Sequence, residues 1–465
     1  MPTNPPHLDE YTARWLPWLV AMSFFMQMLD GTILNTALPA IARSLGENPL
    51  RMQAVIIAYL LAQAICIPAS GWLTDRWGPR SLMGMSIGFF TFGSLLCALS
   101  TDLYFMVAAR VVQGLGGALM VPVGRLVILR LYPKGELVRV LSIIPIPGLF
   151  GNLIGPALGG FLVEYASWHW IFLINLPVGI FGIWATLKLM PRFEPDREHR
   201  FDFIGFIVFG LSLVLLSLGT EGLGNPDISM GAAALLAFGG LAVQIFYWLV
   251  LSRRTRSLFK PSIFKTNTFS VGLAANLFAR LGSSAIPFLT PLLLQVGLGY
   301  SPLTSGLMMI PMAMASVVAK MATRPLAARF QYRSILLTNT CIQGLLIVSL
   351  AFASTHMYPP LFCLQLALMG GVNSLQFSFL NTYTLMDLPY EDSGSGNALM
   401  SVMMQLSMSL GVGLAAAVLM LFHGTPEAGG GAGSESMLVA FQHTFLTVGA
   451  TAVLSALLFF LAPKK

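Results

Sequence analysis

The sequence predicts an all-α polytopic membrane protein with fourteen transmembrane helices. Of its 465 residues, 56% are hydrophobic and only 10% are charged, whereas a soluble domain has about 25% charged residues. Apolar runs of roughly 18 residues or more recur along the chain, and each is long enough to cross a bilayer as a helix. The basic residues lie between these runs in an uneven pattern, which tests the number of runs independently.

Charged and Pro/Gly-rich clusters divide the chain into these spans. The short polar turn EGLGNPD separates the seventh span from the eighth, and this pair is the least clearly marked. The predicted limits are 15–38, 52–73, 82–100, 103–129, 139–163, 168–190, 203–221, 229–251, 268–296, 303–322, 334–354, 359–386, 394–422 and 439–462.

The distribution of Lys and Arg supports fourteen spans and predicts their orientation. If both termini are cytoplasmic, all but four of the 26 basic residues lie on the cytoplasmic side. Arg43 and Arg51 lie on the opposite side, and Arg110 and Arg280 lie within spans. One missed helix would mix the two sides, so the positive-inside rule favours a multi-pass protein with both termini cytoplasmic. We expect the basic cluster SRRTRSLFK (252–260) to contact anionic lipid headgroups.

Two sets of six spans flank a pair of additional spans. The predicted units are residues 1–200, the two extra spans at 201–260, and residues 261–465. The polar stretch GWLTDRWGPRSLMG after the second span has a degenerate counterpart, RPLAARFQYRSILL, after the tenth. Duplicated six-helix halves are typical of carriers whose substrate site lies near the membrane midplane between the halves.

No motif in the sequence indicates an enzyme. We find no P-loop, no Rossmann fingerprint after a strand and no nucleophile elbow. The six histidines and four cysteines lack the spacing of metal ligands. The basic residues are spread over many short loops, which argues against a nucleic-acid surface. We therefore expect no catalytic residue, no cofactor and no metal.

Several polar and glycine-rich motifs lie in or between the spans. They are LDGTILNTALP (29–39), GWLTDRWGPR, RVVQGLGGALMVP (110–122), GLFGNLIGPALGG (148–160), SWHWIFLINLP (167–177) and RFDFIG (200–205). Together they resemble the major facilitator superfamily and, within it, the fourteen-helix drug:proton antiporter family, most closely its multidrug exporters from enteric bacteria. The resemblance covers essentially the whole chain. It implies the major facilitator fold, with two extra helices between the halves, and a place in the bacterial inner membrane.

The loop motif after the second span contains Gly71, Asp75, Arg76, Gly78 and Arg80. The dipole of its own helix disfavours an acid at this C-terminal end, so Asp75 needs another partner. The resemblance implies that Asp75 acts as a conformational latch, facing a helix N-terminus of the other half, here 392–397, when the carrier is open outward. It also implies a fourth-helix arginine as partner, for which Arg125 is suited, and the glycines would permit close approach. The alternative is a solvated loop that sets topology, for which Arg76 and Arg80 suffice.

The fifth span carries the small residues and the proline of the antiporter motif. These are Gly151, Gly155, Pro156, Gly159 and Gly160. Glycines four residues apart lie on one helix face and let a neighbouring helix approach closely, and the proline permits a bend. The resemblance implies that the motif serves as a hinge and a seal. Generic packing of small residues is the alternative.

Asp30 and Arg110 lie well inside the first and fourth spans, at similar predicted depth. Each costs about 2.5–3.5 kcal/mol at a helix centre, so we expect both to have a role. Burial favours the neutral carboxyl and a nearby arginine favours the carboxylate, so a change in water access could load and release a proton. We predict that Asp30 is the proton site and Arg110 its partner. A permanent structural salt bridge is the alternative.

Polar side chains within the spans are expected to line a central cavity, because amides are costly in lipid. Arg280 lies near the midplane, and no span of the second half contains an acid to pair with it. An unpaired guanidinium favours an anionic or carboxylate-bearing substrate. The alternatives for Arg280 are backbone carbonyls near Gly282 or a contact with Asp30, and for each amide an interhelical hydrogen bond. The predicted cavity residues are Gln27, Asn35, Gln113, Arg280, Gln295, Asn373, Asn381 and Gln405.

These observations favour proton-coupled export of small molecules, of the multidrug-efflux type. One alternative is an exporter of an organic anion or a metal–carboxylate chelate. Others are a uniporter or importer on the same fold, and a membrane receptor or assembly subunit that transports nothing. The expected partners are a small-molecule substrate, protons and membrane lipid, without nucleic acid, and the chain is expected to be monomeric.

Overall fold

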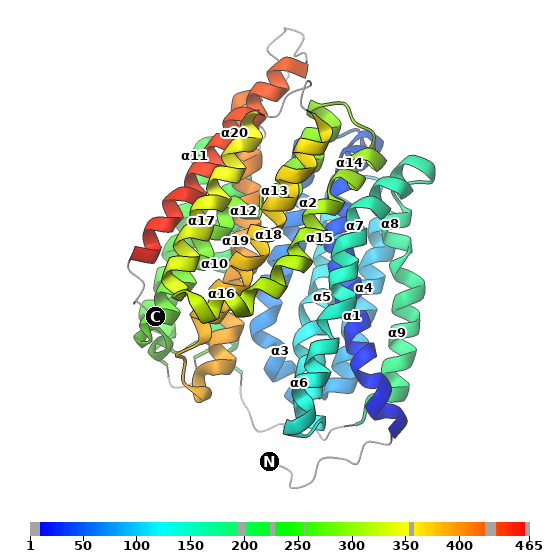
Figure 1. Ribbon diagram of the computed structural model, residues 1–465. Coiled ribbons are helices and arrows are strands. Elements are labelled where there is room, and N and C mark those ends of the chain that lie inside the picture. The colour runs from blue at the N-terminus through cyan, green and yellow to red at the C-terminus, as the bar shows by residue number, and fades with distance from the viewer. Residues whose placement is uncertain are drawn as a thin grey trace.

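The computed structural model describes residues 10–192, 201–223, 228–254, 257–352, 358–423 and 434–460. Every regular element in these ranges is helical, and fourteen of the helical segments there are long and apolar enough to cross a membrane. These findings confirm the predicted all-α polytopic fold. Figure 1 shows one bundle whose long helices run between the end where the first helix begins, at Glu10, and the opposite end, here called the N-terminal side and the far side.

The first six spans are built from nine α-helices and two short 3-10 helices, Pro49–Met52 and Ile67–Ala69. The α-helices are α1 (Glu10–Leu45), α2 (Gln53–Cys66), α3 (Ser70–Trp77), α4 (Pro79–Ala98), α5 (Leu103–Leu131), α6 (Lys134–Ile143), α7 (Pro145–Tyr165), α8 (Trp170–Leu173) and α9 (Asn175–Leu189). Pro68 stands between α2 and α3, and Pro145 opens α7 directly after α6. A proline cannot donate the helical hydrogen bond, so these two spans are divided there. α1 packs along α7, while α5 packs against α2 and α4.

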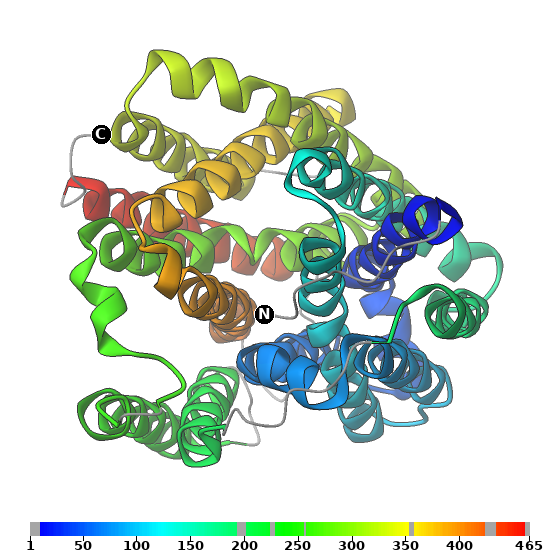
Figure 2. The ribbon, with the colours of Figure 1, turned by 90° about the horizontal axis from the view of Figure 1, so that it is seen from below.

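The extra pair and the last six spans follow in order. They are α10 (Phe203–Gly222), α11 (Met230–Phe246), α12 (Asn267–Ser283), α13 (Ile286–Leu292), α14 (Pro302–Met308), α15 (Ile310–Ala319), α16 (Thr323–Arg329), α17 (Tyr332–Ser349), α18 (Pro359–Leu385), α19 (Ser393–His423) and α20 (Ser434–Ser455). α12 packs against α18, α19 and α20, and α15 packs against α18. α10 and α11 pack against each other as a hairpin at one edge of the bundle (Figure 2).

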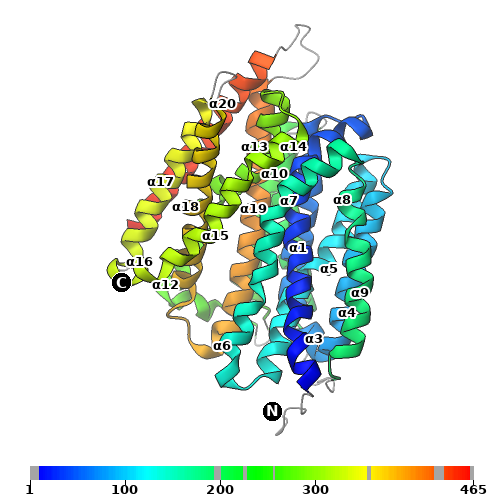
Figure 3. The same ribbon diagram turned by 45° about the vertical axis from the view of Figure 1, so that its right-hand side comes forward.

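Two seams join the first six spans, here called the first set, to the last six spans, the second set. At one seam α7 packs against α14 at the far side (Figure 3), and at the other α2 packs along α19. α10 contacts both α2 and α19 and therefore covers the second seam. On the N-terminal side, α3 packs on α4 and α5, and α16 packs on α18. Packing between the two sets is thus confined to the far side at the first seam, whereas the second seam continues past the end of α2, where residues 67–69 also pack on α19.

The glycines of the antiporter motif bring α7 against α1. A Cβ atom added at Gly151 would lie 3.0 Å from the carbonyl oxygen of Phe25, and one added at Gly155 would lie 3.2 Å from the amide nitrogen of Ile33. A Cβ atom at Gly159 would lie 2.5 Å from the carbonyl oxygen of Ile33. These three glycines therefore pack within the first set of helices, at a distance that only glycine allows.

Gly160 and Pro156 face the second set instead. A Cβ atom added at Gly160 would lie 2.8 Å from the Cα atom of Leu303, and Gly306 of α14 lies directly against Pro156. A backbone amide crosses the same seam, because Leu303 N donates to Glu164 Oε2 at 2.9 Å. One motif thus serves two contacts, with α1 along one face and with α14 at its far-side edge.

The first helix is longer than predicted. The apolar pattern gave 15–38, whereas α1 spans Glu10–Leu45 and includes Pro17 and Pro39. Apolar composition marks only the part of a helix that lies in hydrocarbon, and the backbone hydrogen bonds continue into the polar interface. The tenth span likewise runs over Pro302–Arg329 rather than 303–322, in three short helices.

The close contact between α7 and α1 makes a testable prediction. Gly159→Ala places a methyl group against a backbone carbonyl that cannot turn away, so it should destabilise the protein by about 1–3 kcal/mol. Gly84→Ala is the matched control, because a Cβ atom there meets nothing within 4 Å. We expect the thermal unfolding temperature of the purified protein to fall for Gly159→Ala and to hold for Gly84→Ala. Equal unfolding temperatures of Gly159→Ala and Gly84→Ala would contradict the close packing of α7 against α1.

Candidate functional site

The buried carboxylate of Asp30 lies at the centre of a polar group inside the first set of helices. Arg110 Nη1 of α5 donates to Asp30 Oδ2 at 2.6 Å. Gln113 Nε2, one turn further along α5, donates to Asp30 Oδ1 at 2.7 Å. Asp30 and Arg110 are each only 1% exposed. The structure therefore brings together the two charged residues that the sequence placed at similar depth.

Gln113 connects the carboxylate to two further helices. Its Oε1 atom accepts from Arg110 Nη1 at 2.6 Å, and its Nε2 atom also donates to Ser94 Oγ of α4 at 2.7 Å. Asn175 Nδ2, at the start of α9, donates to Ser94 Oγ at 3.2 Å and lies 3.4 Å from Asp30 Oδ1. Side chains of α1, α4, α5 and α9 therefore form one continuous network around Asp30.

The guanidinium of Arg110 is also held by α2. Its Nε atom donates to the carbonyl oxygen of Val55 at 3.3 Å, and its Cζ atom lies 4.2 Å from the ring centroid of Tyr59. Taking two charges out of water costs several kcal/mol per ion, and the cost is offset only if their remaining polar atoms are bonded. Val55 and Tyr59 supply these contacts, so α2 is tied to the ion pair.

Small residues let α5 reach this position. A Cβ atom added at Gly93 would lie 2.6 Å from the Cα atom of Gln113, and one at Gly114 would lie 2.7 Å from the carbonyl oxygen of Tyr59. The glycines of the motif RVVQGLGG and Gly93 therefore allow α4, α5 and α2 to meet at backbone contact, as small residues do in membrane helix packing. This close approach brings Ser94 and Gln113 within hydrogen-bond distance.

The arrangement can hold a proton as well as a charge. Gln113 presents both an acceptor and two donors, so it can serve a carboxylate or a neutral carboxyl group. Breaking only one member of a buried ion pair leaves an uncompensated charge, which costs about 3–5 kcal/mol. Protonation of Asp30 would therefore leave Arg110 buried without its counter-charge, so the site favours the carboxylate as long as α2 and α5 keep these positions.

A second polar group lies on the seam between α2 and α19. Gln405 Nε2 of α19 donates to Gln63 Oε1 of α2. Gln27 of α1 and Gln63 both approach the Tyr59 hydroxyl, but the hydroxyl, Gln27 Oε1 and Gln63 Nε2 reach no hydrogen-bond geometry with any described residue. We call Gln27, Tyr59, Gln63 and Gln405 the seam amide cluster. It adjoins the ion pair through Tyr59.

Arg280 of α12 lies among amides and an aromatic ring. Its Nε atom donates to Asn276 Oδ1 at 3.0 Å, its Nη2 atom to Asn381 Oδ1 at 3.4 Å, and its Cζ atom lies 4.6 Å from the ring centroid of Phe377. No carboxylate in the described ranges forms an ion pair with it. Neither alternative from the sequence holds in this conformation, because Arg280 bonds neither a backbone carbonyl nor Asp30.

Three other predicted cavity residues lie away from these groups. Gln295 Nε2 donates to the carbonyl oxygen of Thr36 at 2.8 Å, across the far-side seam. Asn373 Oδ1 accepts from Gln343 Nε2 at 3.2 Å, within the second set. Asn35 Nδ2 bonds a carbonyl oxygen one turn earlier in its own helix, at 3.2 Å. Asn373 and Asn35 thus make the hydrogen bonds between or within helices that were the alternative to cavity lining, whereas Gln295 makes such a bond and also lines a cavity at the far side.

The acid of the loop motif is bonded within its own set of helices. Asp75 Oδ1 accepts from Arg130 Nη2 at 2.8 Å. The expectation of Arg125 was wrong for this conformation, because Arg130, in the last turn of α5, stands level with the end of α3. Gly78 has φ +75°, which favours glycine. Gly71 makes no close approach here, since a Cβ atom at this position meets nothing within 4 Å.

The two arginines of the loop motif also bind locally. Arg80 donates to the carbonyl oxygen of Leu187, near the C-terminal end of α9, where a cation is favourable. The Cζ atom of Arg76 lies 5.8 Å from the ring centroid of Trp72. Arg80 therefore ties the loop to α9 of its own half of the molecule, while Arg76 lies over a ring of its own helix.

Sequence reasoning missed several residues of these two groups. Gln63 is an amide within an apolar span, and the rule that selected Gln27 would have found it. Asn175 belongs to the motif SWHWIFLINLP, where it was not singled out. Ser94 and Tyr59 carry no signal in the sequence, because hydroxyl groups are common in membrane helices and only packing shows which ones reach a charge.

Comparison with known proteins places this geometry in a family. Residues 20–412 match the Major Facilitator Superfamily. The protein named "Putative multidrug resistance protein MdtD" from Salmonella heidelberg (strain SL476) is 46% identical over 453 residues, covering 97% of this chain and 95% of the relative. The protein of the same name from Serratia proteamaculans (strain 568) is 49% identical over 412 residues, covering 88% and 86%. These matches confirm the resemblance that the motifs gave.

Solved structures show the same fold at low identity. The D-xylose–proton symporter has a TM-score of 0.70 at 12% identity, covering 97% of this chain and 98% of that chain. The nucleoside transporter NupG has a TM-score of 0.67 at 13% identity, covering 96% and 99%. The human organic anion transporter MFSD10 (TETRAN) has a TM-score of 0.60 at 16% identity, covering 98% and 100%. These likenesses concern the arrangement of helices alone.

Proposed function

Because the chain belongs to the major facilitator superfamily, we propose that this transporter exports small molecules in exchange for protons across the bacterial inner membrane. The name of its relatives, a multidrug resistance protein, supports export. The distribution of basic residues supports cytoplasmic termini, although residues 1–9 and 461–465 lie outside the described ranges. The working unit in this proposal is a monomer with units 1–200, 201–260 and 261–465.

The observation that carries the proposal is the buried pair of Asp30 and Arg110. It lies next to the seam amide cluster, and Tyr59 belongs to both groups. A substrate that binds at the seam and moves α2 relative to α19 also moves the ring that covers Arg110. Binding of substrate and binding of a proton at Asp30 therefore compete through Tyr59. Entry of one proton contributes about 2.3 kcal/mol per 100 mV of membrane potential, which can drive export.

In this proposal the contacts between the two sets alternate between the far side and the N-terminal side, as alternating access requires. In this structure the two sets pack at the far side, where Gly160 and Pro156 of the antiporter motif meet α14. This is the arrangement expected when the site is reached from the N-terminal, cytoplasmic side. In the opposite state, Asp75 would leave Arg130 and face the start of α19, whose free backbone N–H groups favour an anion. The loop motif would then act as a latch.

A second candidate concerns the charge of the substrate. Within the described ranges Arg280 has amide oxygens as its partners and no acid, and its guanidinium lies in the second half near the predicted midplane. An anionic or carboxylate-bearing substrate, including a metal–carboxylate chelate, would pair with it bidentately. This observation favours an exporter of organic anions within the same proton-coupled scheme.

The role of Asp30 can be tested in proteoliposomes with an imposed pH gradient. Asp30→Asn keeps an oxygen for Arg110 but cannot take up a proton, so pH-driven transport should fall to the level of empty vesicles. The probes are a cationic dye and a radiolabelled dicarboxylate. Asp102→Asn is the control, because Asp102 only caps the exposed start of α5. Full pH-driven transport by Asp30→Asn would sink the proton-site assignment.

The role of Arg280 can be tested with the same vesicles. Arg280→Ala and Arg280→Lys should both reduce transport of the dicarboxylate, the alanine variant by about tenfold or more, because a charge-assisted hydrogen bond contributes about 1.5–3 kcal/mol. Arg324→Ala, at an exposed base of α16, is the control. The anion assignment is wrong if wild type exports the dye but no anion, and Arg280→Ala leaves dye export intact.

The latch can be tested by measuring the separation of the two sets on the N-terminal side. Spin labels at Gly135 and Gln331, both exposed, report this distance in a variant without native cysteines. Asp75→Asn loses the outward-state contact with α19 and should shift the distribution toward the wide separation. Glu136→Gln, another exposed acid on that side, should leave it unchanged. Identical distributions in wild type and Asp75→Asn would exclude the latch.

A further inference from the structure

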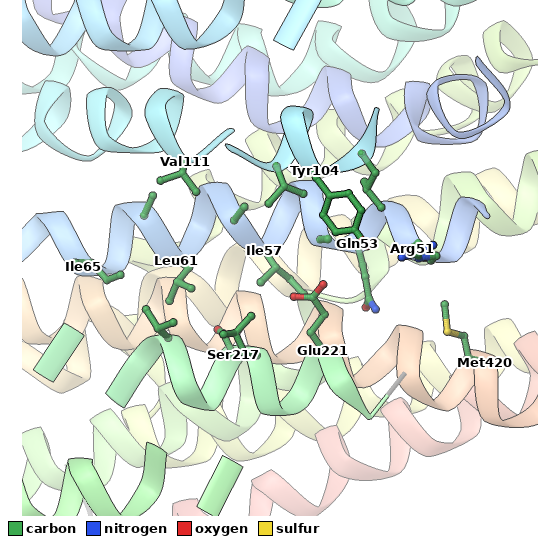
Figure 4. A pocket seen from close by; sticks show the side chains of 17 residues that line it. Arg51, Gln53, Ile57, Leu61, Ile65, Tyr104, Val111, Ser217, Glu221 and Met420 are labelled. Atoms are coloured by element: carbon green, nitrogen blue, oxygen red, sulfur yellow. The ribbon is translucent and has the colours of Figure 1, made fainter. Parts of the chain in front are cut away.

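A cavity of about 370 Å³ lies beside the seam that α10 covers, apart from the buried ion pair (Figure 4). Its walls come from α2, α5 and α10, with Met420 of α19 at one end. Figure 4 shows Leu61, Ile65 and Val111 lining one part of the cavity, and Glu221 and Gln53 facing each other in another. The cavity is therefore apolar along most of its length and polar at one end. Its size falls within the range of ligand sites, about 300–1,000 Å³.

The cavity is reached from the lipid. Tyr104 of α5 and Leu218 of α10, on opposite walls, are 73% and 43% exposed on the surface of the bundle. On the inner side, Ser217 is fully buried and its hydroxyl bonds that of Ser409 of α19 at 2.8 Å. The groove thus opens toward the membrane and is closed toward the centre of the molecule.

Two acceptors converge at the polar end. Glu221 lies in the last turn of α10, and its carboxylate has no hydrogen bond or ion pair with any described residue. Gln53 is 2% exposed and lines the cavity, and its Oε1 atom has no hydrogen-bond partner in the described ranges. A buried acceptor without a donor costs about 1–3 kcal/mol. The pair therefore favours a ligand that is both positively charged and an N–H donor.

A basic residue, Arg51, lies at the same end of the cavity. Arg51 lies in the turn Pro49–Met52 that precedes α2, lines the cavity, and bonds Glu47 at 3.0 Å. The positive charge of Arg51 interacts electrostatically with the Glu221 carboxylate. A simple cation would be repelled by this guanidinium, whereas a group that carries a phosphate beside its ammonium would be favoured by both charges. The end of α10 lies at the far-side end of a membrane span, where lipid headgroups are found.

We propose that this cavity binds a zwitterionic aminophospholipid of the phosphatidylethanolamine class. One acyl chain lies between α2, α5 and α10, the primary ammonium donates to Glu221 and Gln53, and the phosphate lies toward Arg51. A choline headgroup has no N–H to donate, and an anionic lipid without an amine leaves Glu221 unpaired. The lipid contacts α2 of the first set directly, and it contacts α19 of the second set through Met420 and through α10, which packs on α19. It therefore stabilises the arrangement that is closed at the far side.

Native mass spectrometry of the full-length purified protein with added lipids tests this assignment. We expect wild type to retain phosphatidylethanolamine about tenfold better than phosphatidylcholine of the same chains, which corresponds to about 1.4 kcal/mol. In Glu221→Gln, which removes the charge and keeps the shape, the preference should fall to about twofold or less. Glu164→Gln, a far-side acid at the other seam, should keep the full preference.

A second variant separates the groove from the headgroup contact. Leu218→Trp fills the lipid-facing opening and should reduce retention of both lipids, while its unfolding temperature shows that the protein is folded. Equal retention of the two lipids by wild type, or an unchanged preference in Glu221→Gln, would overturn the proposal. Displacement of the lipid by an equimolar single-chain alkylamine would also overturn it, because the cavity would then select an amine rather than a phospholipid. None of these readouts depends on transport.

Discussion

A charged side chain inside a membrane has to be paired or hydrated, and Asp30 and Arg110 meet this requirement in each other. The pair also imposes the geometry around it. The remaining donors and acceptors need partners in a space that holds few, and Gln113, Ser94 and the carbonyl oxygen of Val55 supply them from three helices. Four of the first six spans contribute side chains or carbonyl oxygens to this network, and a fifth, α9, reaches it through Asn175.

The small residues follow from the same constraint. Backbones must approach closely for short side chains such as Ser94 to reach the charge, and Gly93 and Gly114 permit this at the site. The antiporter motif does the same for α1 and α7 further along. The result is a first set of helices that is closely packed around its charge and meets the second set along two seams. Tyr59 lies where the hydrogen-bonded network and one seam meet, which is why we propose the coupling role for it.

Much of the fold could be predicted from the sequence. A bilayer is crossed by apolar helices of a minimum length, and the basic residues indicate which helix ends lie on the same side of the membrane. The pairing of Asp30 with Arg110 was predicted from their similar depth, together with what the family resemblance implies about the first and fourth spans. The partner of Asp75 could not be predicted in the same way. Arg125 and Arg130 both lie on α5, and only the packing of α3 on α5 shows that Arg130 is the one within reach of Asp75. The cavity at Glu221 was also missed, because this acid sits in a turn at the end of a span and resembles an ordinary interfacial residue. Gln295 and Asn373 show that an amide within a membrane span indicates a polar partner without saying whether that partner is another helix or a substrate.

The central claim is that Asp30 exchanges a proton during transport, and infrared difference spectroscopy of the protein in membranes tests it most directly. The C=O stretch of a protonated carboxyl group should appear when the medium is acidified and should be missing from the same difference spectrum of Asp30→Asn. Addition of a transported substrate should diminish this band in the wild type, since we propose that substrate and proton compete through Tyr59. If the wild-type and Asp30→Asn difference spectra are the same, Asp30 and Arg110 form a permanent salt bridge, and the proton is carried elsewhere.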